Sequence, residues 1–185
     1  KDAEALEQTY KMKALLLDKT GTITEGKPTV EKIEWLPEAE KDKYNNILYS
    51  LEKASEHPLA DAIAANLKSL SSSLILDDIQ SITGKGITAK HKDVRYYAGG
   101  NRLIRENNIE ISHELEKLAT RWEEEARTIV YFADSNNVLA VISVTDPIKK
   151  NSVQAIQQLK LMGIEVFMVT GDNELTALSL AKEVG

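Results

Sequence analysis

Residues 18–24 have the residue types of a phosphoryl-transfer site. They read Asp-Lys-Thr-Gly-Thr-Ile-Thr and follow the apolar run 13–17, which predicts a fully buried parallel strand ending at Asp18. Ligands of parallel α/β sheets bind at the carboxyl ends of the strands, and the Thr-Gly-Thr turn offers backbone N–H groups to a phosphate. Because an aspartate is ionised at neutral pH, Asp18 can attack a phosphoryl group directly and form an aspartyl phosphate.

A second apolar strand is predicted at residues 164–169, and it too ends in a polar turn. Thr170, Gly171 and Asp172 follow it and precede a helix that is predicted from about Glu174. The N-terminus of a helix favours phosphate, so this turn is a second candidate phosphate site. Taken alone, it is more typical of an ordinary turn and helix cap.

Three further segments carry candidate residues. Asp146-Pro147-Ile148-Lys149 marks the point where the hydrophobic pattern changes. Ser-Glu-His-Pro-Leu-Ala at residues 55–60 lies between two predicted helices, where a lone His usually caps or packs. Gly-Lys-Gly at 84–86 and Gly-Asn at 100–101 lie beside predicted strands, and a Gly-x-Gly alone is weak evidence for nucleotide binding.

The predicted elements give an α/β fold with an α+β insert. Both ends of the chain show strands and helices typical of a parallel sheet. Strands are predicted at 29–36, 74–87, 94–98, 128–133 and 138–144, and helices at 38–54, from Pro58, and after Ser112. We therefore expect a discontinuous outer domain at 1–28 and 145–185 and an inserted domain at 29–144.

Composition excludes several classes of protein. The chain has 185 residues, a formal net charge of −6 and no cysteine. The acidic balance argues against nucleic-acid binding, and zero Cys excludes a thiolate metal site or a cysteine nucleophile within this chain. No apolar run reaches the length of a membrane span.

The motif at residues 18–24 resembles the phosphorylation motif of P-type ATPases, a branch of the haloacid-dehalogenase superfamily. The resemblance implies that Asp18, with Lys19 and Thr20, forms the catalytic segment. It also implies that Asp18 and Thr20 contribute to an incomplete Mg²⁺ site. Thr170 then binds phosphoryl oxygens, and Gly171 and Asp172 approach the nucleotide. Asp146 and Lys149 match hinge positions linked to nucleotide and phosphate; for Lys149 a solvated turn is an equally good interpretation.

The insert resembles the nucleotide-binding domain of heavy-metal-transporting P-type ATPases. The resemblance implies that Glu56 and His57 recognise the adenine of ATP or ADP. It implies further that the backbone at four more positions lies at the nucleotide site: Gly84, Gly86, Gly100 and Asn101.

Thr20 separates two enzyme classes. Soluble phosphatases of the superfamily usually carry a second Asp two residues after the nucleophile, and this chain has Thr20 there. Without that carboxylate, water attack on an acyl phosphate lacks a base, which suits a pump. A soluble phosphatase and a pure nucleotide-sensing module remain the alternatives.

The resemblance implies a longer protein, of which this chain is a cytoplasmic part. The partners are then the actuator and transmembrane domains of the same polypeptide and a transported heavy-metal ion. We expect export of copper, with zinc, cadmium or lead as the alternative. The Gly-Asp-Gly-x-Asn-Asp segment that completes the Mg²⁺ site is absent here. We therefore expect weak binding of ATP or ADP and little phosphorylation by this chain alone.

Overall fold

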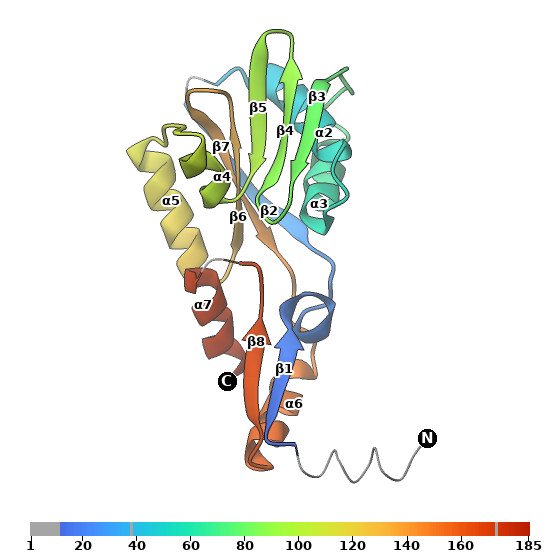
Figure 1. Ribbon diagram of the computed structural model, residues 1–185, viewed down its shortest axis with the longest axis vertical. Helices are drawn as coiled ribbons and strands as arrows, with labels where there is room; N and C mark the ends of the chain where they lie inside the picture. Colours follow the sequence, from blue (N-terminus) through green and yellow to red (C-terminus); the bar gives the residue numbers. More distant parts are fainter. Residues whose placement is uncertain (1–11, 38, 173) are drawn as a thin grey trace.

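The computed structural model describes residues 12–37, 39–172 and 174–185, so the first 11 residues of the predicted outer domain lie outside it. Two sheets form the described part (Figure 1). The smaller is the parallel pair β1–β8, and the larger has six antiparallel strands in the order β2-β7-β6-β5-β4-β3. The strands are β1 (Ala14–Asp18), β2 (Thr29–Trp35), β3 (Asp77–Ile82), β4 (Gly86–His91), β5 (Val94–Gly99), β6 (Thr128–Ala133), β7 (Val138–Thr145) and β8 (Glu165–Val169).

Seven helical segments accompany the sheets in the described residues. They are η1 (Lys19–Ile23), a single distorted turn, and α2 (Lys41–Lys53), α3 (Pro58–Leu67), α4 (Asn101–Glu106), α5 (His113–Glu124), α6 (Ser152–Leu161) and α7 (Glu174–Val184). No helix among these described segments has the length and hydropathy needed to cross a membrane.

The larger sheet separates two hydrophobic clusters, one on each face. Side chains on neighbouring positions of a strand point to opposite faces, and β6 follows this rule. Val130 and Phe132 pack in the cluster that includes α2 and α3 residues, whereas Ile129 and Tyr131 pack with α4 and α5 residues. Helices therefore cover both faces of this sheet, as Figure 1 shows.

The strand β1 is not fully buried, so that prediction is wrong. Side chains along β1 and β8 alternate between half-buried and exposed: Leu16 is 67% exposed and Phe167 51%. The inner face packs in a small cluster with α6 and α7, and no described element covers the outer face. A parallel pair with helices on one side buries only alternate residues.

Local signals predict most element ends correctly. Ser112 Oγ accepts a hydrogen bond from Leu115 N at 3.3 Å and caps α5, as predicted. Pro58 stands in the first turn of α3, and Gly163, with φ of +78°, follows α6. Two features differ from the prediction. The segment expected as one strand at 74–87 divides into β3, a turn and the start of β4, and α4 was not predicted.

Two chain crossings join the sheets on one side of the molecule. The segment leaving η1 and the segment leaving β7 run together, because Glu25 N donates to the Pro147 carbonyl at 2.8 Å and Lys149 N donates to the Ile23 carbonyl at 3.0 Å. On the other side, α7 lies against α5 (Figure 1).

Candidate active site

Asp18 and Thr170 are placed side by side at the carboxyl edge of the small sheet. Asp18 is the last residue of β1 and lies opposite Val169, the last residue of β8, in parallel register. The loop after β1 and the loop after β8 therefore begin at the same edge, as the sequence pattern predicts. The side chain of Asp18 is exposed and forms no hydrogen bond or ion pair with another residue that the structure describes.

The loop of η1 is folded around Thr24. Thr24 is 1% exposed; its backbone N donates to the Lys19 carbonyl at 3.0 Å, and its Oγ1 accepts from Gly21 N at 3.3 Å. Gly21 has φ of +77°, a left-handed conformation that glycine adopts without strain. These contacts close the loop that follows Asp18 into a compact turn.

Asp146 fastens this turn to the segment that returns from β7. The Thr24 hydroxyl donates to Asp146 Oδ2 at 2.5 Å, and Lys27 N donates to Asp146 Oδ1 at 3.0 Å. Lys149 Nζ donates to the Gly21 carbonyl. Both residues of the predicted hinge segment therefore contact the Asp18 loop, and here Lys149 binds the loop backbone itself.

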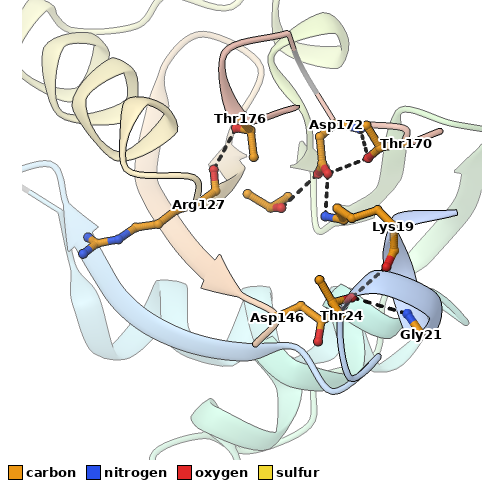
Figure 2. A network of polar contacts seen from close by, with 9 residues as sticks. Lys19, Gly21, Thr24, Arg127, Asp146, Thr170, Asp172 and Thr176 are labelled. Atoms are coloured by element: carbon orange, nitrogen blue, oxygen red, sulfur yellow. Dashed lines mark hydrogen bonds and ion pairs between the residues drawn. The ribbon is translucent and has the colours of Figure 1, made fainter. Parts of the chain in front are cut away.

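A buried ion pair joins the two loops. Lys19 Nζ lies 2.5 Å from Asp172 Oδ2, and the two side chains are 12% and 8% exposed. Thr170 Oγ1 donates to the same oxygen at 2.6 Å (Figure 2). Thr128 Oγ1 donates to Asp172 Oδ1 at 2.9 Å. Burial alone would raise the pKa of Asp172, but the ammonium of Lys19 and the two hydroxyl donors outweigh it and lower that pKa.

The donors beside Asp18 fit Mg²⁺. This ion prefers oxygen ligands and is usually held by one or two carboxylates together with substrate phosphates. The exposed Asp18 carboxylate and the main-chain carbonyl of Thr20, also exposed, are oxygen donors on the same loop. The described residues hold no group of three or more His, Asp or Glu side chains that could bind a metal alone.

The predicted glycines meet where β4 begins and β5 ends. A Cβ on Gly86, whose φ is +145°, would lie 2.2 Å from the Ala98 carbonyl oxygen. The Gly100 N donates to the Lys85 carbonyl at 2.9 Å, while Gly84 and Gly100 face open space. Gly99, not singled out from the sequence, is equally constrained, since its Cβ would lie 2.2 Å from the Lys85 carbonyl oxygen. The sequence feature that could have pointed to Gly99 is the pair of adjacent glycines at positions 99 and 100.

Glu56 and His57 are exposed at the start of α3. His57 is the N-cap residue, and its Nδ1 accepts a hydrogen bond from Leu59 N at 3.2 Å. No hydrogen bond or ion pair between described residues joins this pair to the glycines. The capping role is therefore observed, and adenine recognition stays a prediction.

Glu52 is a buried acid that the sequence pattern does not single out. It lies in the last turn of α2, five residues before His57, and is only 4% exposed. Burial raises its pKa to about 8. Strongly shifted acids cluster at functional sites, but from sequence Glu52 is one charged residue on an amphipathic helix.

The fold and the site define the class of this protein. Residues 12–185 match the haloacid dehalogenase-like hydrolase family, and the chain belongs to it. The predicted family resemblance and the predicted α/β fold are thereby confirmed.

Within that class the chain is homologous to copper-transporting P-type ATPases. It is 38% identical over 186 residues to a probable copper-importing P-type ATPase A of Enterococcus hirae, which covers all of this chain and 25% of that protein. It is 36% identical to a copper-exporting P-type ATPase of Staphylococcus saprophyticus, covering 100% and 23%. The chain thus spans about a quarter of the length of these relatives.

Two solved structures resemble this chain in fold. The catalytic domain of the CPx-ATPase CopB-B matches with a TM-score of 0.72 at 22% identity, over 100% of this chain and 62% of that one, which shows the fold. A zinc-transporting PIB-type ATPase matches with a TM-score of 0.61 at 26% identity, over 98% of this chain and 29% of that one.

Proposed function

We propose that this chain is the ATP-binding and phosphorylation part of a copper-transporting P-type ATPase, with Asp18 as the residue that accepts the γ-phosphoryl group of ATP. The observation that carries the proposal is the convergence of three sequence segments at the end of β1. The loop after Asp18 is fastened to Asp146 and Lys149 on one side and to Asp172 on the other. The copper-transporting relatives support the choice of metal.

The proposed reaction is an in-line displacement. An Asp18 carboxylate oxygen forms a bond to the γ-phosphorus of ATP, the bond from that phosphorus to the β,γ-bridging oxygen breaks, and ADP leaves. Asp18 and Thr20 would hold Mg²⁺, which would supply positive charge next to the phosphoryl oxygens. The chain's own contribution is to keep Asp18 exposed at the rim of a loop whose backbone is fixed by Thr24. Thr170 lies at the same edge, and we assign it to the phosphoryl oxygens.

We assign nucleotide binding to residues 29–144, the larger sheet and its helices, and phosphorylation to residues 1–28 and 145–185. The Gly84–Gly86 end of the β3–β4 hairpin faces the β1–β8 sheet, since the β4–β5 turn is at the far end (Figure 1). Open space at Gly84 and Gly100 allows the backbone to approach a ligand, with Asn101 next in sequence. In this proposal Glu56 and His57 contact the adenine.

In the complete protein the phosphorylated Asp18 would drive conformational change in membrane helices that move the metal. The chain would then lie on the cytoplasmic side and work with actuator and transmembrane domains of the same polypeptide. The relatives include a probable importer and an exporter, so the proposal is copper transport, and the predicted export stays a prediction. A zinc pump is the second candidate, favoured by the structural match to a zinc-transporting enzyme.

A nucleotide titration of the chain, followed by NMR, tests the assignment. We expect saturable ATP-dependent shifts at the glycine amides. His57→Asn is the informative variant, because Asn preserves the helix cap while removing the imidazole. Loss of one stacking or buried polar contact should weaken binding about 5- to 150-fold.

His113→Ala is the matched control, since His113 is an exposed histidine at the start of another helix, α5. It should bind ATP like the wild type. Unchanged affinity in His57→Asn would refute adenine recognition by His57, and absence of saturable binding in a folded wild-type chain would refute the nucleotide-binding assignment.

A further inference from the structure

The two sheets also meet through a set of polar contacts away from the chain crossings. The segment 124–128 runs from the last residue of α5 to the first residue of β6, and its backbone carbonyls accept hydrogen bonds from hydroxyl groups of α7. Thr176 Oγ1 donates to the Arg127 carbonyl at 2.9 Å, and Ser179 Oγ donates to the Glu124 carbonyl at 2.9 Å. Both contacts dock α7 on this segment through backbone acceptors (Figure 2 shows the first).

The contact of Thr128 is of a different kind. Its hydroxyl donates to a carboxylate oxygen, Asp172 Oδ1, at 2.9 Å. The other oxygen of the same carboxylate, Oδ2, lies 2.5 Å from Lys19 Nζ. Asp172 therefore uses one oxygen for Thr128, the first residue of β6, and the other for Lys19, the residue directly after Asp18. Figure 2 shows the second of these contacts.

This arrangement restrains Lys19 through a short chain of contacts. Asp172 and Lys19 are buried, where a charge-assisted contact is strong and an unpaired charge is costly. The backbone carbonyl of Lys19 accepts the hydrogen bond from Thr24 N that closes the loop. Rotation of the Asp172 carboxylate would thus move the side chain of Lys19. It would also weaken the hydrogen bond from Thr24 N to the Lys19 carbonyl.

Thr170 also donates to Asp172, but it lies on the same loop as Asp172 and moves with it. Thr128 approaches from the larger sheet, so its contact depends on where that sheet lies. We infer that Thr128 is a positioning residue for the Asp18 loop, acting through Asp172 and Lys19. The inference rests on the proposed function, because it matters for phosphorylation only if Asp18 is the nucleophile.

Amide hydrogen exchange at Thr24, measured by NMR on the 185-residue chain, tests this role. Thr128→Val keeps the shape of the side chain and removes the donor. We expect the Thr24 amide to exchange roughly tenfold faster, the effect of one lost hydrogen bond to a charged group. The ¹³C shift of the Asp172 carboxyl should move in the same variant.

Two further variants separate positioning from packing. Thr128→Ser retains the hydroxyl and should restore the wild-type exchange rate and carboxyl shift. Ser179→Ala removes a neighbouring contact between α7 and the same segment and should leave both readouts unchanged. Wild-type exchange at Thr24 in Thr128→Val, or equal acceleration in Ser179→Ala, would overturn the inference.

None of these readouts requires phosphoryl transfer, so the two proposals can fail separately. A loop loosened by Thr128→Val, together with an Asp18 that never accepts phosphate from ATP in the complete protein, would leave the positioning contact standing and remove the proposed function. Phosphorylation of Asp18 with an unchanged Thr24 amide in Thr128→Val would do the opposite.

Discussion

Two carboxylates close to the Asp18 loop, those of Asp146 and Asp172, are committed to structural contacts. Asp146 accepts from the Thr24 hydroxyl and from Lys27 N, and Asp172 pairs with Lys19. Hydrolysis of an acyl phosphate needs a group that removes a proton from water. Thr20, at the position where a base would follow the nucleophile, carries no carboxylate. If Asp18 accepts a phosphoryl group as proposed, we expect the acyl phosphate to react with water only slowly.

A missing base at position 20 predicts how the chain acts on an aryl phosphate ester. The wild type should hydrolyse it only at a trace rate. Thr20→Asp, which adds a carboxylate on the exposed side of the loop, should raise the rate about 100-fold, the usual size of general acid–base catalysis. Asp18→Asn in that background should abolish the gain. Fast turnover by the wild type, lost in Asp18→Asn, would instead favour a phosphatase.

At the scale of single elements, Glu52 in helix α2 makes the free energy of unfolding depend on pH. Its pKa is raised by burial from 4.5 to about 8, so the folded state retains a proton that the unfolded chain releases between these values. The free energy of unfolding should therefore fall as pH rises from about 4.5 to about 8. Below about pH 4.5 both the folded and the unfolded state hold the proton, so Glu52 no longer makes the stability depend on pH.

Glu52→Gln removes this titration and should flatten the pH dependence of stability in that window, measured by urea unfolding at several pH values. Asp42→Asn replaces an exposed acid of the same helix and should leave the slope as it is. An unchanged slope in Glu52→Gln would show that Glu52 is not the titrating group.

Elements with strong local signals could be predicted from the sequence. The hairpin of β6 and β7 follows from two β-rich runs around a polar turn, and the start of α5 follows from Ser112. Six-residue α4 has too few turns to show a helical period. The apolar run of β1 by itself predicts burial, because such a run shows that a strand prefers burial but not what covers it.

For the candidate site too, the sequence predicts which residues follow the strands but not which contacts form between distant segments. Asp18, Thr170 and Asp172 could be placed at one sheet edge, since parallel strands bring their carboxyl ends together. Thr128 could not, because a Thr at the start of a strand is an ordinary β-former and its hydroxyl contact depends on tertiary placement. Thr24 likewise shows its role only once Asp146 is folded against it.

At the scale of the whole molecule, the two sheets differ in how much core supports them. The larger sheet lies between two extensive clusters of buried side chains. The small sheet rests on a cluster with four buried members, Ile23, Ile156, Leu180 and Val184. Its outer face leaves Leu16 and Phe167 more than half exposed. Fewer buried contacts mean a lower free energy of local opening.

Stability should therefore be uneven across the chain, and native-state hydrogen exchange would detect it. We expect amides in β1 and β8 to exchange roughly tenfold or more faster than those in β6 and β7. The covalent crossings and the contacts of α7 limit this difference, because they join the small sheet to the larger one. Equal protection of all four strands would show that the chain opens as a single cooperative unit.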